Sequence, residues 1–498
     1  MKKINKYFIS IVLCLSILFS YSFATPLDTV KRIINTYYYE DVDMESINAG
    51  NSIDEVLSTL NDPYSQYFSK EEYLAFTDKV EQAFVGIGIQ IEKDDKGIFI
   101  SRILDNSGAF EAGLLANDII THIDDKNVLD LGFDQSIDAI RGPENSIVSL
   151  TILRNNQSQK IEVKRKKVIL PDVTYEYMKN DTLYIEVSTF AHETSLNFRE
   201  ALVSYPNAKN IIVDLRSNSG GYLKTAQEIA GFFIGDYLCV TARNSDNKTV
   251  NYRGFQQDIL IDPSTNVYIL TNKHSASASE VLTAALVDYD AATVIGNTTY
   301  GKGVMQELFN IDNIGILKLT TYKLFSPYEN VFNKVGIKPD ITVTPSVDSK
   351  QTAMLIINSS NDLKYNIDNN EYFVDLNISR NPEYWPSAYD LYFRYNETLN
   401  KKLLPSQLFY GLSNIHKKVT PNKNNDISFN CTILDKSLFH PTLINAITGE
   451  TTLLSYTQKG NTITFSLDPL DMGDYFIKLD KGFKTDKGKT PVLLNFTI

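Results

Sequence analysis

The sequence predicts a multidomain α+β protein with four successive regions: a helical N-terminal arm, a small sheet domain, a layered α/β core and an all-β C-terminal accessory region. Three observations favour this fold class. The 498 residues exceed what one hydrophobic core usually holds. The apolar fraction of 43% and the charged fraction of 22% are ordinary for a globular protein. The spacing of apolar residues also changes along the chain, which marks where one region gives way to the next.

The first 24 residues have the composition of a signal peptide. Lysines within residues 2–6 precede an uncharged apolar stretch, residues 7–21, and Ser22 and Ala24 are the small residues that a signal peptidase reads. We therefore expect cleavage before Thr25 and a secreted or extracytoplasmic protein of the cell envelope, with a signal of the bacterial type. The apolar stretch is shorter than the ~20 residues of a membrane span. Membrane association is expected only in the alternative case, in which this segment stays uncleaved as an anchor.

Residues 25–76 are expected to form a helical arm. Apolar residues recur at helical spacing in LDTVKRIINTYYYEDV and again in SIDEVLSTL, which ends before the break at Asp62-Pro63. Ser69 followed by Glu72 is a candidate capping box that opens the next helix.

Residues 77–168 are expected to form a compact domain with a five- or six-stranded sheet and two small helices. The segment FVGIGIQIEKDDKGIFISRIL predicts two alternating strands around a turn, and SIVSLTILR with QKIEVKRKKV predicts a closing hairpin. The segments NSGAFEAGL and GFDQSIDAIRG supply the helices.

Residues 169–345 alternate between strands and helices; LYIEVSTF precedes HETSLNFREALVSY, and KNIIVDLR precedes YLKTAQEIAGFFIG. Repeated units of this kind predict a layered α/β fold whose loops at strand ends carry the chemistry. Residues 346–498, with Asn-rich turns and alternating strands such as NTITFSLDP, predict an all-β region. Within it, residues 346–414 form an accessory segment without an assigned role, and residues 415–498 form a β domain.

Charge and cysteine content argue against several function classes. The net charge of −12 is unfavourable for binding nucleic acid, which requires clustered Lys and Arg. The basic run Lys164-Arg165-Lys166-Lys167 is expected to be the solvated end of a strand. Beyond the signal segment the cysteines are Cys239 and Cys431, in different regions, so neither a disulfide framework nor a Cys/His zinc site is expected. No metal and no cofactor are expected.

A strand-to-helix turn in the α/β region could bind an oxyanion. In IIVDLRSNSGGYLKTA, an apolar strand leads through Gly220-Gly221 into a helix. Glycines at such a turn let backbone N–H groups face a ligand without a side chain in the way. The alternative is an ordinary connection that uses glycine only for turning.

A second strand-to-helix turn, YILTNKHSASASEVLTAAL, offers serine hydroxyls beside the first N–H groups of a helix. Ser275, Ser277 and Ser279 are all candidates for a nucleophile. Helix capping is the alternative role for Ser277 or Ser279.

A lysine between two glycines is the candidate base for such a serine. Lys302 lies between Gly301 and Gly303 in VIGNTTYGKGVMQEL. It is either a solvated surface lysine or an amine pressed against packed backbone, where burial lowers its pKa. Gln306 is an uncharged candidate to hold that amine. Histidine is the usual base, but the five histidines offer no matching motif, so a Ser–Lys pair is the better hypothesis.

Four of these segments together resemble a known family. DLRSNSGG, NKHSASASEVLTAALVD, TTYGKGVMQ and GIKPDITVTP, in this order and spacing, resemble the motifs of the carboxyl-terminal processing peptidases, also called tail-specific proteases. The similarity continues upstream through LNDPYSQYFSKEEY and the PDZ-like GIGI, AGLLANDIITHID and IRGP, and covers about residues 28–345. It implies a PDZ domain in residues 77–168 and a crotonase-like layered Ser–Lys protease core in residues 169–345. It also implies a secreted serine endopeptidase for protein substrates with exposed C-termini, and a homodimer paired through the helical arm.

The resemblance assigns catalytic roles residue by residue. Ser277, the middle serine of the SASAS run, is the implied nucleophile, Lys302 the implied general base and Gln306 its support. The backbone N–H of Ala278 and that of a glycine from the pair Gly220 and Gly221 would form the oxyanion hole.

The resemblance also assigns a peptide-binding loop. Gly86, Ile87, Gly88 and Ile89 match the loop that holds a terminal carboxylate while the peptide adds a strand to the sheet edge. Arg141, in the IRG turn, is a second candidate for contacting the carboxylate or the catalytic domain, with a surface salt bridge as the alternative.

Two positions depart from the family pattern. His274 stands where a small residue is common, and Ala116-Asn117 replaces the usual Pro-Gly pair. Neither departure removes a catalytic group, and both bear on the affinity of the PDZ domain.

Residues 415–498 faintly resemble bacterial immunoglobulin-like modules. Two alternatives to an endopeptidase stay open from the residues alone: a non-catalytic PDZ scaffold that binds peptides, and a Ser–Lys amidase that acts on cell-wall peptide. The presence of Ser277, Lys302 and Gln306 disfavours the scaffold.

Overall fold

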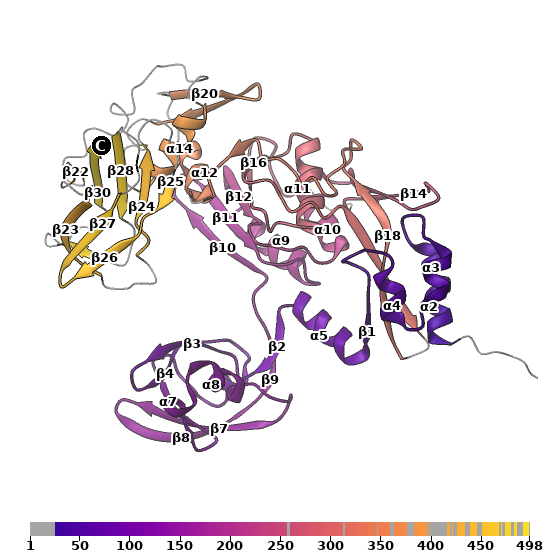
Figure 1. Cartoon of the computed structure of the whole chain (residues 1–498), viewed down its shortest axis with the longest axis horizontal. Helices are drawn as coiled ribbons and strands as arrows, with labels where there is room; N and C mark the ends of the chain where they lie inside the picture. Colours follow the sequence, from indigo (N-terminus) through magenta and orange to yellow (C-terminus); the bar gives the residue numbers. More distant parts are fainter. Residues whose placement is uncertain are drawn as a thin grey trace, which may run out of the picture. The chain divides into compact units, whose positions relative to one another are not determined.

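The computed structural model describes most of the chain between Thr25 and Tyr395, and separate stretches of the C-terminal region (Figure 1). It describes residues 25–395 except 256–258, 312–313, 346, 359–362 and 376–382, and it further describes 398, 416–418, 421, 426–433, 439–445, 451–467, 470, 474–479, 483–485 and 492–497. The predicted signal segment, residues 1–24, lies outside the described residues. Within the described part of the chain, no helix is long and apolar enough to cross a membrane.

The chain divides into two compact units, each built from separate stretches of sequence. Among the described residues, unit one contains those up to Asp172 together with those in Val240–Tyr252 and Gly303–Asn333. Unit two contains the described residues in Val173–Cys239 and Arg253–Lys302 and those from Lys334 onward.

The N-terminal arm of unit one is helical, as its apolar spacing predicts. It comprises α2 (Pro26–Tyr37), α3 (Met44–Ala49), α4 (Ile53–Ser58), the short strand β1 (Gln66–Ser69) and α5 (Lys70–Val80). The capping box at the start of α5 is present, because Ser69 Oγ accepts from Glu72 N and Glu72 Oε2 accepts from Ser69 N. Val30, Ile34 and Val56 of the arm share a buried cluster with the hairpin of β17 (Val304–Ile311) and β18 (Gly315–Phe325). β1 pairs with β18, which also pairs with β13 (Leu238–Arg243), the neighbour of β14 (Thr249–Arg253).

The second part of unit one is a six-stranded sheet with short helices. The strand order is β3-β4-β5-β7-β8, with β6 paired to β5, so β3 is an edge strand. The strands are β3 (Ile89–Asp94), β4 (Gly97–Ile103), β5 (Ile119–Ile123), β6 (Lys126–Asn127), β7 (Ile147–Arg154) and β8 (Gln157–Lys164), and the helices are α6 (Gly108–Glu111), α7 (Val128–Leu131) and α8 (Phe133–Ile140). A separate ladder of β2 (Ala83–Gly86) with β9 (Lys166–Ile169) joins the two ends of this domain.

Unit two is built on a six-stranded sheet with the order β10-β11-β12-β15-β16-β19. The strands are β10 (Val173–Met178), β11 (Thr182–Val187), β12 (Asn210–Asp214), β15 (Asn266–Thr271), β16 (Thr293–Gly296) and β19 (Ile341–Thr342), and the helices after β11, β12 and β15 are α9 (Thr194–Ser204), α10 (Leu223–Ile234) and α11 (Ala278–Asp288). All strands from β11 to β19 in this sheet are parallel. Their carboxyl ends therefore lie along one edge, where the loops after β12 and β15 carry the glycine pair and the serine run.

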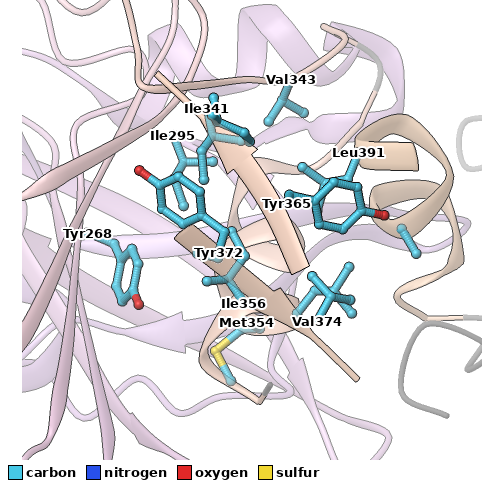
Figure 2. Packing of buried hydrophobic residues seen from close by; sticks show 14 of the residues in the cluster. Tyr268, Ile295, Ile341, Val343, Met354, Ile356, Tyr365, Tyr372, Val374 and Leu391 are labelled. Atoms are coloured by element: carbon cyan, nitrogen blue, oxygen red, sulfur yellow. The ribbon is translucent and has the colours of Figure 1, made fainter. Parts of the chain in front are cut away.

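One face of this sheet is covered by residues that come after the predicted core in the chain (Figure 2). Tyr268 and Ile295 of the sheet pack with Met354, Ile356 and Tyr365 in one buried cluster. The covering elements are α12 (Ser349–Ile357), the hairpin β20 (Leu363–Ile367) with β21 (Asn370–Val374), and α14 (Trp385–Tyr395).

The accessory segment therefore differs from the all-β expectation, because its described part contains two helices beside one hairpin. The apolar run AMLII in α12 is too short for periodicity to distinguish a helix from a strand. Its helical form is decided by packing, since Ala353, Met354, Leu355 and Ile356 are all buried on the sheet.

The described part of residues 415–498 consists of strands in two sheets, with the orders β22-β30-β28-β24-β25 and β26-β27-β23-β29. They are β22 (His416–Lys418), β23 (Asp426–Ile433), β24 (Thr442–Asn445), β25 (Thr451–Leu453), β26 (Tyr456–Lys459), β27 (Thr462–Ser466), β28 (Asp474–Leu479), β29 (Phe483–Thr485) and β30 (Val492–Thr497). Ile463, Phe465 and Ile477 lie in their buried cluster. The immunoglobulin-like assignment of this region stays a prediction.

Candidate active site

The three serines of the turn between β15 and α11 have different environments. Ser275 is fully buried, and its Oγ donates to the carbonyl of Leu215 at 2.8 Å. Ser279 is also fully buried, and its Oγ donates to the carbonyl of Asn218 at 2.9 Å. Ser277 is the one of the three that is partly exposed. Two of the hydroxyls therefore hold the turn together, and the middle one can reach a substrate.

Ser277 has a backbone conformation that is rare for a residue with a side chain. Its φ of 59° and ψ of −115° lie outside the regions that L-residues favour, and it immediately precedes α11. A residue held in this way costs of the order of 1–3 kcal/mol and needs surrounding contacts that fix it. Gly220 supplies close backbone packing, because a Cβ at that position would lie 2.7 Å from Ser277 Cβ.

Glu280, which the sequence did not single out, contacts both the serine turn and the lysine loop. Its carboxylate is fully buried and accepts four hydrogen bonds. Oε2 accepts from the backbone N–H of Ser277 at 2.9 Å and of Lys302 at 2.8 Å. Oε1 accepts from Thr299 Oγ1 at 2.6 Å and from Gly301 N at 2.7 Å. One buried carboxylate therefore ties the serine turn to the lysine loop, and these donors offset the cost of burying its charge.

The loop that carries Lys302 is fixed by its backbone. Tyr300 N donates to the carbonyl of Ser275 at 2.9 Å, and Lys334 N donates to the carbonyl of Gly301 at 2.7 Å. Gly301 has a φ of 91°, which favours glycine. Because Ser277 N and Lys302 N bind the same carboxylate oxygen, these two nitrogens are separated by no more than the sum of the two hydrogen-bond lengths. The Lys302 side chain is partly exposed.

Gln306 has a different setting from the other predicted catalytic residues. It lies in β17, in unit one, at an irregularity in the pairing with β18. Its Nε2 donates to Thr320 Oγ1 at 3.2 Å, and Thr320 N in turn donates to Ser65 Oγ at 3.0 Å. The supporting role of Gln306 toward Lys302 stays a prediction.

The predicted oxyanion donors differ in whether their N–H groups already have an acceptor in the structure. Ala278 is the first residue of α11, so its N–H is one of the first-turn donors that have no acceptor inside the helix. The Gly220 N–H, however, donates to Asn218 Oδ1 at 2.8 Å. Gly220 nevertheless packs against Ser277 and Ala278, so which glycine of the pair supplies the second donor stays a prediction.

Two segments of the chain match models of known protein families. Residues 181–343 match the family model described as Peptidase family S41, and residues 75–153 match that of the PDZ domain. Residues 181–343 belong to peptidase family S41. The small sheet domain before them is a PDZ domain.

Relatives of similar sequence carry the name "Probable CtpA-like serine protease". The chain is 32% identical to that of Staphylococcus aureus (strain N315) over 326 residues, which cover 65% of each protein. It is 32% identical to that of Staphylococcus haemolyticus (strain JCSC1435) over 320 residues, which cover 64% of each. The match thus spans somewhat less than two thirds of these relatives. A solved "Photosystem II D1 C-terminal processing protease" is 21% identical with a TM-score of 0.42, covering 65% of this chain and 93% of that one.

A partly exposed arginine pairs with a buried carboxylate at the end of β12 in the S41 domain. Asp214 is almost fully buried, and both of its oxygens bind the Arg216 guanidinium, at 2.6–2.9 Å. Tyr184 Oη donates to the same carboxylate at 2.7 Å, and burial together with this charge raises the pKa of Tyr184. Arg216 also reaches Asp348, the N-cap of α12, at 2.7 Å. The strand leading to the glycine pair is therefore anchored to the accessory segment.

The predicted carboxylate loop of the PDZ domain has its carbonyls turned inward. The Ile87 carbonyl accepts from Ala109 N at 2.8 Å, and the Gly88 carbonyl accepts from Leu104 N at 3.0 Å. Because the C=O and N–H of a trans peptide point in opposite directions, the N–H groups of Gly88 and Ile89 point away from these partners. Gly88 has a φ of 77°, and a Cβ there would lie 2.2 Å from Ser107 Cβ.

The structure accommodates the departures from the family pattern. Asn117 has a φ of 74°, in the left-handed region that asparagine tolerates better than most residues, so it can stand in for glycine. His274 is exposed, and its N–H donates to Asn272 Oδ1 at 2.9 Å. Arg141 is exposed as well, with its guanidinium carbon 5.9 Å from the centre of the Phe84 ring.

Proposed function

We propose that this protein is a secreted serine endopeptidase of the C-terminal processing type, in which Ser277 and Lys302 form the catalytic pair. One observation carries the proposal: the buried Glu280 carboxylate binds the backbone N–H of both residues. The strained, partly exposed position of Ser277 between two buried, hydrogen-bonded serines supports it. The S41 and PDZ matches and the names of the relatives agree with this activity.

In the proposed reaction, Ser277 Oγ attacks the carbonyl carbon of the scissile peptide bond while its proton passes to the neutral amine of Lys302. The carbonyl oxygen becomes an oxyanion, which the N–H groups of Ala278 and of Gly221 or Gly220 would stabilise. The C–N bond then breaks, and the Lys302 ammonium gives its proton to the leaving amine.

The remaining acyl-enzyme is an ester of Ser277. Lys302 takes a proton from water, the resulting hydroxide attacks the ester carbon, and the proton returns to Ser277 Oγ as the carboxylic acid leaves. Gln306 is proposed to hold the Lys302 amine without supplying a proton of its own.

Substrate capture is assigned to the PDZ domain. The N–H groups of Gly88 and Ile89 would bind the free carboxylate of a protein substrate, and the edge strand β3 would pair with its last residues. The proposal places the protein outside the cytoplasm, released by cleavage before Thr25.

Digestion of casein by the mature protein tests the nucleophile, with Ser277→Ala as the variant and Ser279→Ala as its matched control. Ser277→Ala should abolish digestion and Ser279→Ala should retain it. Equal digestion by Ser277→Ala and the unmodified protein would remove Ser277 from the mechanism. Mass spectrometry of the products from one defined peptide, with either a free or an amidated C-terminus, tests the terminal preference. Equal cleavage of both forms would instead favour the Ser–Lys amidase.

A further inference from the structure

Arg165 is a buried cation in the basic run that the sequence predicts to be solvated. Its relative exposure is 7%, whereas Lys164 and Lys167 on either side are exposed. Lys166 and Lys167 form ion pairs with Glu111 and Asp78. Within the described part of the chain, no carboxylate forms an ion pair with Arg165. A buried guanidinium without a counter-ion must be stabilised by other means.

The Arg165 guanidinium has four acceptors, two of which are carbonyls at the end of helix α8. Nε donates to the Ile140 carbonyl at 2.9 Å, and Nη2 donates to the Ala139 carbonyl at 2.8 Å. Nη1 donates to the Ile147 carbonyl and to Ser146 Oγ, both at 3.0 Å. The last carbonyls of a helix lack intrahelical donors and carry partial negative charge. Arg165 therefore offsets the negative end of α8 and holds it to the chain that begins β9.

The residue that ends α8 approaches the strand that leads into the predicted carboxylate loop. Arg141 is the C-cap of α8, and its guanidinium approaches the ring of Phe84 in β2. β2 ends at Gly86, the first residue of that loop. Packing at the turn after Arg141 is tight, because a Cβ at Gly142 would lie 2.9 Å from Arg165 Nε. A peptide carboxylate bound here would be close to the negative end of a helix, which is unfavourable unless a cation compensates it.

We propose that Arg165 is a positioning residue of the carboxylate site, acting through α8 without touching the peptide. Its charge offsets the helix end near which the carboxylate is proposed to bind, and its hydrogen bonds hold both sides of the turn that follows Arg141. The inference rests on the proposed function, in which the PDZ domain captures free C-termini. It assigns to this site a dependence on a buried positive charge at position 165.

The test measures the binding of two fluorescein-labelled peptides of identical sequence ending in valine, one with a free carboxylate and one amidated. Binding is followed by fluorescence anisotropy to the mature protein carrying Ser277→Ala, which prevents cleavage. The ratio of the two dissociation constants measures carboxylate recognition. Arg165→Met should raise the dissociation constant of the free-carboxylate peptide by about tenfold, within the range for charges at partly buried helix ends. The dissociation constant of the amidated peptide should be unchanged. Arg165→Lys keeps the charge but donates fewer hydrogen bonds. Its ratio of dissociation constants should therefore lie between those of the unmodified protein and Arg165→Met.

Arg154→Met is the matched control. Arg154 is also an arginine of the PDZ domain, but its guanidinium pairs with the buried Asp118 at 2.6 Å and donates to the Gly113 carbonyl rather than to the carbonyls of α8. Arg154→Met should leave the ratio of the two dissociation constants as it is in the unmodified protein, even if this substitution lowers the melting temperature. A ratio unchanged by Arg165→Met would overturn the inference. If Arg165→Met fails to fold, Arg165→Gln, which removes the charge but can still donate hydrogen bonds, decides in its place by the same ratio. Equal binding of both peptides before any Arg165 substitution would instead overturn the capture of C-termini.

Discussion

The S41 site and the carboxylate loop of the PDZ domain are both proposed to present backbone N–H groups to negative charge, but the buried charges that hold the two regions are of opposite sign. At the S41 site, the Glu280 carboxylate gathers N–H and O–H donors and so shapes the turn and the loop around it. In the PDZ domain, the Arg165 guanidinium gathers carbonyl acceptors from the end of α8 and the start of β7. Glu280 is thus stabilised by backbone N–H groups of the serine turn and the lysine loop, and Arg165 by backbone carbonyls at the end of α8. In each case, the groups that stabilise the charge belong to the segments that the charge holds in place.

This difference predicts that chemistry and recognition can be lost separately. Substitutions around Glu280 should lower the rate of bond cleavage and leave peptide binding to the PDZ domain intact. Substitutions around Arg165 should do the reverse. A single substitution that abolished both properties in a folded protein would show that the two sites are not independent.

The largest effect is expected for Lys302→Ala. Loss of the general base should lower kcat for a peptide substrate by about 10³-fold to 10⁴-fold. Binding of a free-carboxylate peptide to the PDZ domain should be unchanged, because Lys302 lies outside that domain. Steady-state kinetics and fluorescence anisotropy measure the two quantities. A variant that keeps most of its kcat would show that another group accepts the proton.

Glu280→Gln should have the next largest effect. The amide replaces one acceptor oxygen with a donor, which then faces the N–H groups that the carboxylate binds. We expect kcat to fall about 10-fold to 100-fold through misplacement of the serine and the lysine, and the free energy of unfolding to fall by about 3 kcal/mol. Kinetics on a short ester substrate and urea unfolding measure these changes.

Asp118→Asn is the control for Glu280→Gln, because it alters an equally buried carboxylate in the PDZ domain. It should lower stability but leave kcat on the short ester unchanged. If both variants lose the same activity, the effect of Glu280 is one of general stability.

Gln306→Ala should lower kcat by about 10-fold if its amide holds the Lys302 amine. The observed hydrogen bond to Thr320 offers a second variant for this test. Thr320→Val removes that bond, frees the amide to turn, and should lower kcat by about threefold. A Gln306→Ala variant with unchanged kcat would assign the glutamine to the strand pairing alone.

The smallest effect is expected for Asp348→Asn. Its side chain is 47% exposed, so its ion pair with Arg216 is screened by solvent. The buried contacts of Arg216 with Asp214 remain. We expect kcat to stay within about twofold of the unmodified protein. A larger loss, measured in the same assay, would show that the accessory segment controls the position of the glycine loop.

The main elements of the fold can be predicted from local patterns in the sequence. The strand–helix units of residues 169–345 are long and periodic, and their motifs lie on turns whose small residues mark them. The helices of the accessory segment were not predicted, because α12 becomes helical by packing on the sheet face rather than by its own pattern. The sequence predicts strands for all of residues 346–498. The regular elements described in residues 415–498 are strands, in agreement with this prediction, whereas those in residues 346–414 include helices.

The candidate site was predictable in its reactive groups but not in its supports. Ser277 and Lys302 stand in motifs of small residues, which sequence alone can mark. Glu280 comes three residues after Ser277, a spacing typical of a capping box, and that signal could have singled it out. Its contact with Lys302 depends on tertiary structure, as does the burial of Arg165. Charged residues in a run are usually solvated. Arg165 is buried instead because its side chain packs against the end of α8, a contact that the local sequence does not reveal.

Covalent labelling with a serine-directed fluorophosphonate tests the central claim most directly, because it reports on the serine and its base together. The account predicts a single adduct, located by peptide mass spectrometry at Ser277, and a labelling rate at least about 100-fold lower in Lys302→Met. Ser279→Ala should still form its adduct at Ser277. An adduct on a different serine, or undiminished labelling of Ser277 in Lys302→Met, would contradict the Ser–Lys pair.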